Sequence, residues 1–332
     1  MEGNRPGVRF LLVEMQSLLS RESVKVTLVV NTGSRRGQDA LRWSEEMLRS
    51  AGIDDIESHA VHSGDELLAT LDKVSEQKPD LLFIGGGDGS VSAAAARFGG
   101  TDVVLAVLPL GTANDFARTL ELDQDPRTAA RQMLEGKVIN VDIGKANGHT
   151  FLNVASFGLS VAVTDALDPR LKKVIGPAAY PVATLAAYRH HDPFTARLEF
   201  PEGDHDDLEL DDLLQVAVGN GRHYGGGNKI SPTASLDDDL LDVYAIVRGR
   251  MRDHVSIARL LKSGHFIEHD QVHHFTTRAV RITTEEPMPI NLDGEIATST
   301  PADFTFESSA LHVAVPIRSR AGRLDGPPPQ VP

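Results

Sequence analysis

From Lys25 onward, the first third of the chain alternates short β-branched runs with helical stretches. The run Lys25–Asn31 (KVTLVVN) meets a loop at Thr32–Gly37 and then a helical stretch at Gln38–Ala51, which together make one strand–helix unit. The order repeats in three further units, at Ile56–Val61 with Gly64–Gln77, Asp80–Gly85 with Ser90–Arg97, and Val103–Leu108 with another helix. Four consecutive units predict a doubly wound parallel sheet.

After Gly136 the pattern changes to strands joined by turns, with helical insertions near Ser160–Arg189 and Asp253–Ser263. The expected strands are Val138–Ile143, Thr150–Ala155, Thr195–Phe200, Leu213–Gly219, Leu241–Val247, Val280–Thr284, Met288–Leu292, Asp303–Glu307 and Leu311–Val315. This pattern predicts an antiparallel β-sandwich or barrel. The fold class is therefore α/β plus β, and the cleft between the two domains is the expected ligand site.

The composition excludes several classes of protein. Lys and Arg number 33 against 47 Asp and Glu, and the formal charge of −14 argues against broad nucleic-acid binding. The chain has no cysteine, which excludes cysteine nucleophiles and zinc–thiolate sites. It has no apolar run of about 18 residues, so no transmembrane segment is expected. An anionic ligand must therefore be held by a local feature of the fold.

A glycine-rich segment follows the third expected strand. The sequence Leu81–Ser90 (LLFIGGGDGS) places three glycines, an acid and a fourth glycine between a strand and a helix. Backbone amides approach a ligand closely there, and a helix N-terminus favours phosphate. The segment is neither the dinucleotide glycine fingerprint nor the P-loop. Taken alone, it fits a tight turn as well as a phosphate site.

A second unusual segment, Leu108–Arg118 (LPLGTANDFAR), follows the fourth expected strand. Thr112 is expected to cap a helix that begins near Ala113, with Asn114 and Asp115 in its first turn. Those two side chains lie close enough to bond both backbone and ligand. Alone, the segment is a capped helix.

Together the two segments resemble the catalytic domain of the diacylglycerol kinase and sphingosine kinase family, in which GGDG and PLGTxNDFA follow successive strands. Further matches are Val218–Arg222 with Gly225–Gly227, Ser231–Val243 (SPTASLDDDLLDV) and Asn291–Glu295 (NLDGE). In this order they look like the bacterial YegS-type lipid kinases, over roughly Val24 to Pro316.

The resemblance implies Mg²⁺-dependent transfer of the ATP γ-phosphoryl group to a hydroxyl of a lipid, diacylglycerol or a phospholipid such as phosphatidylglycerol. It implies nucleotide contacts from Asn31, Thr32, Gly33, Ser34, Gly37, Gly86, Gly87, Asp88, Gly89, Ser90, Val91, Ser92, Gly111, Thr112, Asn114 and Asp115. Asp88 would lie near metal and phosphates, and Glu295 would be the general base, with Asp293 beside it. Asp88 is the alternative base, and the sequence leaves that choice open.

The acidic turn Ser235–Leu240 offers oxygen ligands for a second, structural Mg²⁺. The carboxylate of Asp238 and the carbonyls of Ser235 and Leu240 form a set of hard oxygens suited to this ion. The resemblance implies the same site. The alternative is a solvated acidic hairpin.

Several positions depart from the family pattern. The family's GGDGT-x-N-E becomes GGDGSVSA, so Ser92 and Ala93 replace a polar pair. Ala60 stands where a threonine often contacts the nucleotide, and Asp239 stands where a glycine usually follows the metal-binding aspartate. We expect the activity to survive these departures, with a shift in nucleotide or acceptor preference.

The expected organisation is an N-terminal extension over 1–23, an ATP-binding α/β domain over 24–140, a β-sandwich lipid-acceptor domain over 141–317 and a disordered tail over 318–332. No signal peptide is expected, and we expect a cytoplasmic protein, peripheral at the membrane. Basic clusters at Arg170–Lys173 and Arg248–Arg252 fit either a solvated face or contact with anionic headgroups. An NAD kinase-like enzyme and a catalytically silent nucleotide- or lipid-binding module remain as alternative functions. The sequence does not specify the acceptor lipid or the oligomeric state.

Overall fold

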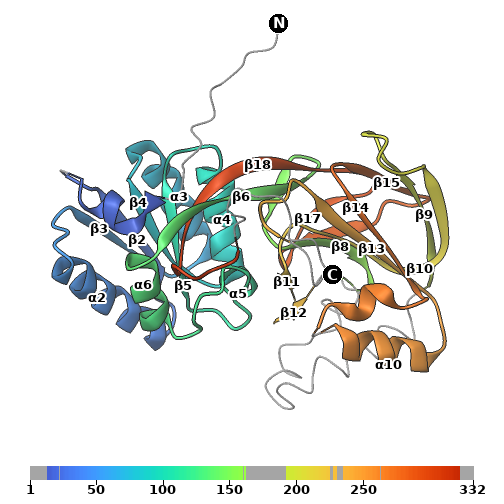
Figure 1. Cartoon of the computed structure of the whole chain (residues 1–332), viewed down its shortest axis with the longest axis horizontal. Helices are drawn as coiled ribbons and strands as arrows, with labels where there is room; N and C mark the ends of the chain where they lie inside the picture. The colour runs from blue at the N-terminus through green and yellow to red at the C-terminus, as the bar shows by residue number, and fades with distance from the viewer. Residues whose placement is uncertain are drawn as a thin grey trace, which may run out of the picture.

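The computed structural model describes residues 13–21, 23–159, 161, 192–224, 227–229, 235–261 and 263–321. Figure 1 shows two halves that lie side by side and are joined by two long strands, β6 (Lys137–Ala146) and β18 (Ala302–Val315). One hydrophobic core fills the N-terminal half and a second fills the β-sandwich of the C-terminal half.

The N-terminal half has a parallel sheet in the order β3-β2-β4-β5. Its strands are β2 (Val26–Asn31), β3 (Ile56–Val61), β4 (Leu81–Gly86) and β5 (Val104–Pro109). Every residue of β4 and β5 is buried, which explains why these strands are apolar without alternation. The predicted parallel sheet is confirmed.

Helices cover both faces of this sheet. They are α2 (Arg35–Ser50), α3 (Gly64–Gln77), α4 (Asp88–Phe98), α5 (Asp115–Thr119) and α6 (Pro126–Leu134). Helix α2 packs with α6, and α3 packs with α4. Local caps set the helix starts, since Ser34 Oγ accepts from Gly37 N and Ser63 Oγ accepts from Glu66 N.

The C-terminal half consists of antiparallel strands. They are β7 (His149–Phe151), β8 (Val154–Gly158), β9 (Phe194–Glu199), β10 (Leu208–Gly219), β11 (His223–Tyr224), β12 (Asn228–Lys229), β13 (Leu241–Val247), β14 (Val272–Thr277), β15 (Val280–Thr284), β16 (Pro289–Leu292) and β17 (Glu295–Ser299). Long strand β10 pairs with β8, β9 and β13. Helix α10 (Met251–Leu260) and the 3₁₀ helix η2 (His265–Glu268) cover Tyr244 of β13. The predicted antiparallel β domain is confirmed.

Strand β18 belongs to both halves. It pairs antiparallel with β15 near Phe304 and parallel with β5 near His312, and it lies between β5 and β6. The expected strands Asp303–Glu307 and Leu311–Val315 are thus one strand, with a bulge between Glu307 and Leu311. The expected boundary at residue 140 follows the order of the sequence. In the fold, the chain returns to the N-terminal half near its end, since Leu311, Val313, Ala314 and Val315 lie in the N-terminal core.

Both ends of the described chain pack against the N-terminal half. Strand β1 (Val13–Glu14) pairs with β6, and the helix α1 (Met15–Leu19) buries Met15 and Leu18. At the other end, Lys137 Nζ donates to Ser319 O over 2.9 Å, and both Ser319 and Ala321 are buried. The expectation of disorder from Arg318 was therefore wrong for residues 318–321. Ser319 is buried and hydrogen-bonded to Lys137 and to Leu120 O, and Ala321 is buried beside it. The rest of the expected tail and most of the insertion expected near Ser160–Arg189 lie outside the described residues.

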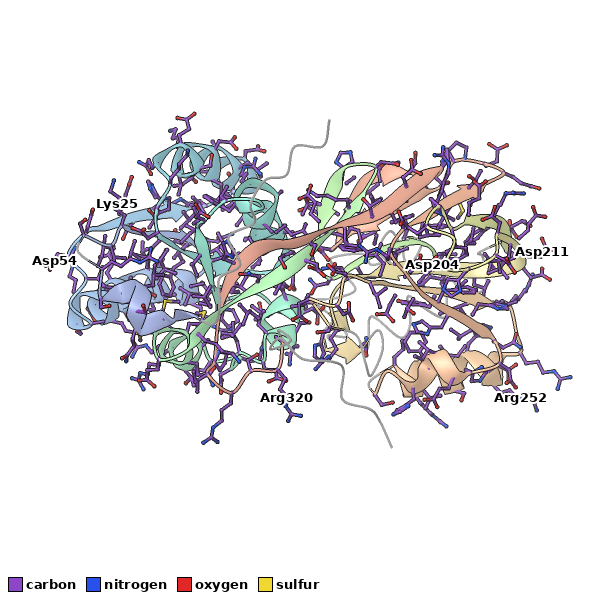
Figure 2. All side chains as sticks on the ribbon, turned by 45° about the horizontal axis from the view of Figure 1, so that its top comes forward. Lys25, Asp54, Asp204, Asp211, Arg252 and Arg320 are labelled. Carbon is purple, nitrogen blue, oxygen red and sulfur yellow. The ribbon has the colours of Figure 1, made fainter. Side chains whose placement is uncertain are left out.

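Figure 2 shows Lys25 and Asp54 at the outer end of the N-terminal half, Asp211 and Arg252 at the outer end of the other half, and Arg320 near the middle. The described chain thus ends close to the junction, where Arg320 N donates to Glu121 Oε2 over 3.1 Å. Within the described ranges, no helix is both long and apolar enough to cross a bilayer.

Candidate functional site

The two glycine-containing loops form one surface at the carboxyl ends of β4 and β5. The amides of Leu110 and Gly111 donate to Gly86 O over 2.9 and 3.1 Å. A Cβ on Gly111 would lie 2.5 Å from the Cα of Gly87, so glycine is required at position 111. The predicted phosphate loop and the PLGT segment are therefore packed backbone against backbone.

Helix α4 begins within the glycine loop, with Gly87 as its N-cap and Asp88 as its first residue. Ser90 and Val91 follow in the first turn, where both amides bond to Gly87 O. The side chain of Val91 is buried in the N-terminal core, so only its backbone is left to contact a nucleotide.

The carboxylate of Asp88 lies between the starts of two helices. Its Oδ1 accepts from Phe116 N of α5 over 3.1 Å. Burial is the main cause that raises the pKa of Asp88 above its ordinary value of 3.8. Hydrogen bonds from the amides of Phe116 and Asp115 oppose this rise, and the charges of Asp115 and Asp293 add to it. The predicted metal contact of Asp88 stays a prediction.

The start of α5 differs from the prediction. Thr112 is exposed and caps nothing; the N-cap is Asn114, in a left-handed conformation with φ 51°, and the helix begins at Asp115. The reason is that position 112 directly follows the close packing of Gly111 on Gly87, and the chain enters the helix only at Asp115. Asn114 Nδ2 donates to Gly111 O over 3.1 Å, while its buried Oδ1 has no hydrogen-bond partner among the described residues.

Asp115 faces the C-terminal half. Its Oδ1 accepts from Gly227 N over 2.7 Å, and one turn later Thr119 Oγ1 accepts from His223 N over 3.1 Å. Helix α5 therefore connects the PLGT segment to β11 and β12. The predicted nucleotide contact of Asp115 stays a prediction.

The loop after β2 is stabilised by its own side chains. Asn31 Oδ1 accepts from Gly33 N over 3.0 Å, and a Cβ on Gly37 would clash with Asn31 O. The buried Thr32 Oγ1 lies 3.2 Å from His62 Nε2, and Glu66 Oε2 accepts from His62 N. Two predicted nucleotide side chains thus already have protein partners: Thr32 pairs with His62 after β3, and Ser34 with Gly37 N at the start of α2.

The NLDGE segment forms the turn between β16 and β17. Asp293 has φ 49° and Gly294 has φ 108°, as an Asp-Gly hairpin turn requires. The Asp293 carboxylate accepts four hydrogen bonds: from Leu152 N (2.6 Å) and Ser92 Oγ (2.7 Å) at Oδ2, and from Asn153 N (2.9 Å) and Val154 N (3.0 Å) at Oδ1.

Glu295 is exposed and lies over the start of α4. Its Oε1 would be 3.5 Å from a Cβ built on Gly89. The structure therefore brings Asp88, Gly89 and Ser92 of one half together with Asp293 and Glu295 of the other, although the sequence places them far apart. Glu295 is the carboxylate of this group that is open to solvent.

The acidic turn Ser235–Leu240 packs against β6. Ser235 Oγ donates to Asp237 Oδ1 over 2.6 Å, and Leu240 N lies 3.3 Å from Asp238 Oδ1. Asp239 takes the left-handed conformation that the family's glycine would allow, with φ 57°. Within the described part of the chain, no three acidic or histidine side chains converge as a metal cluster, so the predicted site depends on Asp238 and on carbonyl oxygens.

Asp142 of β6 is the residue of this region that the sequence analysis missed. Its buried carboxylate accepts from Ser309 N (2.7 Å) and Asp239 N (3.0 Å). Burial raises its pKa to about 6, the two amides lower it, and the charges of Asp239 and Asp237 raise it further. One acidic residue in the mostly apolar run Val138–Ile143 was the available signal, since a carboxylate in a buried strand needs partners.

Comparison with known proteins identifies the family. Residues 25–146 match the diacylglycerol kinase catalytic domain, and residues 153–315 match the YegS C-terminal NAD kinase beta sandwich-like domain. The chain is 33% identical over 304 residues to "Probable lipid kinase YegS-like" of Pseudomonas aeruginosa PAO1, covering 89% of this chain and 95% of the relative. The chain belongs to the YegS-like diacylglycerol kinase family.

One further relative of this lipid kinase matches in sequence, and two solved structures match in fold. The diacylglycerol kinase of Bacillus subtilis is 26% identical over 271 residues, covering 81% of this chain and 88% of the relative. A solved structure from Bacillus anthracis str. Sterne superposes with a TM-score of 0.75 at 25% identity, covering 89% of this kinase and 97% of that chain. A second structure from that organism, of a diacylglycerol kinase, gives a TM-score of 0.68 at 23% identity and shows the shared fold. Membership of a kinase family implies that ATP is used.

Proposed function

We propose that this kinase transfers the γ-phosphoryl group of ATP to a hydroxyl of diacylglycerol or of a phospholipid such as phosphatidylglycerol, with Mg²⁺. The observation that carries the proposal is the position of Glu295 over Gly89, beside Asp88 and the glycine loop. An acceptor hydroxyl held between Glu295 and the terminal phosphate would have a base on one side and the reacting phosphorus on the other.

In this proposal the backbone does most of the phosphate binding. The amides of the glycine loop at the start of α4 approach phosphate without a Cβ in the way. Asn114 lies beside the loops, where its amide donates to Gly111 O and supports the PLGT segment from within. Positioning of this kind is the main requirement of phosphoryl transfer, because the protein supplies little covalent chemistry.

The residues fit Mg²⁺ in two places. Asp88 would hold the ion that accompanies ATP, and Asp238 with the carbonyls of Ser235 and Leu240 would hold a structural ion. When bound, the first ion neutralises phosphate charge as the phosphoryl group moves. The donors are hard oxygens, and the charges of Asp115 and Asp293 make the surroundings of Asp88 negative.

Glu295 is proposed to accept the proton of the lipid hydroxyl. It is exposed to solvent, whereas Asp88 already accepts an amide hydrogen bond from Phe116 and Asp293 accepts four hydrogen bonds. Asp293 therefore suits a structural role in the turn better than proton transfer. Asp88 remains the alternative base.

Peripheral membrane binding accompanies this proposal. Arg248, Arg250 and Arg252 are exposed near the start of α10, and they would contact anionic headgroups. Arg170, Lys172 and Lys173 lie outside the described residues. The fraction of protein that sediments with phosphatidylglycerol vesicles should decrease when the three arginines are replaced by glutamine. With phosphatidylcholine vesicles, the fraction should be the same for the parent and the variant.

The deciding experiment uses radiolabelled ATP, Mg²⁺ and vesicles that contain one candidate lipid at a time. Phosphate is expected on diacylglycerol or phosphatidylglycerol and not on NAD, which is offered in a parallel reaction. Glu285→Gln, an exposed glutamate change in the same half, serves as the control for Glu295→Gln. Label on NAD alone would favour the NAD kinase-like alternative, and nucleotide binding without any labelled product would favour the silent module.

A further inference from the structure

One hydrogen bond and one close approach link the start of α4 to the turn that carries Glu295. Ser92 Oγ donates to Asp293 Oδ2 over 2.7 Å, and Glu295 Oε1 would be 3.5 Å from a Cβ built on Gly89. Gly89 and Ser92 are three residues apart, so they share one face of the helix. Asp293 and Glu295 flank Gly294. The same helix face therefore bonds to Asp293 and lies beneath Glu295.

The four donors to Asp293 come from two segments of the chain. The amides of Leu152, Asn153 and Val154 come from the segment that leads from β7 into β8, and the side chain of Leu152 packs into the N-terminal core. Ser92 lies on α4 of the N-terminal half. The three amides therefore hold the turn against the β7–β8 segment, and Ser92 is the one of the four donors that bonds it to α4.

We propose that Ser92 is a positioning residue for phosphoryl transfer: by donating to Asp293, its hydroxyl holds the β16–β17 turn at the distance from α4 that places Glu295 over the glycine loop. This inference rests on the proposed function. Ser92 stands where the family pattern has asparagine. The Ser92 hydroxyl donates its hydrogen to Asp293, so we assign it no contact with the reacting atoms.

The expected consequence is a change in turnover rather than in nucleotide binding. Without the hydroxyl, Asp293 keeps its three amides and the turn stays folded, but it loses its hydrogen bond to α4, and only packing such as that of α4 against β7 then sets its distance from the helix. A displacement of about 1 Å in a reacting group can cost about 100-fold in rate. We therefore expect Ser92→Ala to lower kcat by about 10- to 100-fold while KM for ATP changes less than about threefold.

Three further variants separate positioning from folding. Ser92→Thr keeps the hydroxyl and should restore kcat to within a few-fold of the parent. Ser92→Cys keeps a side chain of similar size, but its thiol is a poor hydrogen-bond donor. This variant should therefore behave as Ser92→Ala does. Ser75→Ala removes a hydroxyl that bonds only within α3, to Asp72 O, and should leave kcat unchanged.

The decisive measurement is a double-mutant cycle with Glu295→Gln, with kcat and KM for ATP measured on the lipid that the parent phosphorylates. If Ser92 acts through Glu295, then Ser92→Ala should lower kcat less than about twofold in the Glu295→Gln background. An equal loss in both backgrounds, or parental kcat in Ser92→Ala and Ser92→Cys, would overturn the inference while leaving the proposed kinase activity intact. A parent enzyme that phosphorylates no lipid would instead overturn the proposed function.

Discussion

Asp142 of β6 accepts a hydrogen bond from the backbone amide of Ser309 in the bulge of β18, over 2.7 Å. Its other carboxylate oxygen accepts from Asp239 N of the acidic turn, and its carbonyl accepts from Asn220 Nδ2. Asn220 Nδ2 also donates to Leu152 O, next to the amides that hold Asp293. The predicted ion site, the two connecting strands and the NLDGE turn therefore lie in one hydrogen-bonded region.

Replacing Asp238 tests the ion in that region. Mg²⁺ without nucleotide should raise the Tm of the parent protein, because an ion that binds only the folded state stabilises it by mass action. Asp238→Ala should abolish the increase, as measured by thermal melts over a Mg²⁺ titration. Asp54→Ala, an exposed change at the outer end of the N-terminal half, is the control. A parent Tm that does not respond to Mg²⁺ would contradict a structural ion site.

Glu295→Gln tests the proposed base. Glutamine keeps the shape of the side chain but cannot accept the proton, so kcat should fall by about 10²- to 10⁴-fold with KM for ATP near the parental value. Steady-state kinetics on the labelled lipid would measure both. Should turnover survive under conditions in which chemistry limits the rate, Asp88 becomes the base, and Asp88→Asn should then impair Mg·ATP use and turnover together.

Gly111→Ala tests the contact between the two loops. The new Cβ would lie 2.5 Å from the Cα of Gly87, so the loops must separate, at a cost of about 1–3 kcal/mol. Both the Tm and the affinity for ATP, measured by calorimetry, should fall. Gly64→Ala is the matched control, because a Cβ there meets nothing within 4 Å at the start of α3. Parental ATP affinity in a folded Gly111→Ala protein would show that this packing does not shape the nucleotide site.

The buried His312 of β18 should make stability depend on pH. Burial lowers the pKa of His312 in the folded protein; the charge of Asp102 opposes this, and Asn140 Oδ1 is its neutral partner at 2.6 Å. As pH falls below about 6.5, the unfolded chain takes up a proton that the folded chain resists. The stability contributed by neutral His312 is therefore present above that pH and is lost below it.

His312→Asn should flatten this dependence, because asparagine offers a side-chain amide in place of Nδ1 and does not titrate. Denaturant unfolding at pH 7.5 and pH 5.5 would give the two free energies of unfolding, and the parent should lose more stability between them than the variant does. His149→Asn, at an exposed position on β7, is the control. Equal losses in parent and His312→Asn would contradict the effect.

Features that depend on neighbouring residues in the sequence, such as the ends of a helix, were predicted correctly in part. The span Gly64–Gln77 was predicted correctly as α3, because Ser63 caps one end and Lys78 ends the helix in a left-handed conformation. Thr112 was wrongly predicted as a cap, because the path of the chain over Gly87 depends on packing between two loops rather than on residue type.

Contacts across long separations were not visible in the sequence. The motif residues Asp88 and Glu295 were found by resemblance, but neither periodicity nor spacing indicated that Ser92 bonds to Asp293. Likewise, β17 was missed because its residues are mostly exposed and show no buried face, and β14 was missed although it completes the pairing of β13. Pairing partners of this kind depend on the topology of the sheet.

The position of β18 between β5 and β6 has a consequence for synthesis of the protein. β5 ends at Pro109, and the strand that covers its edge ends at Val315. At about 5–20 residues per second, a ribosome needs roughly 10 to 40 seconds to make the chain between them. Throughout that interval the half that carries the glycine loop has an unpaired strand edge, which is where nascent chains associate wrongly and where chaperones bind. The nucleotide-binding half becomes complete only when nearly all of the chain has been made.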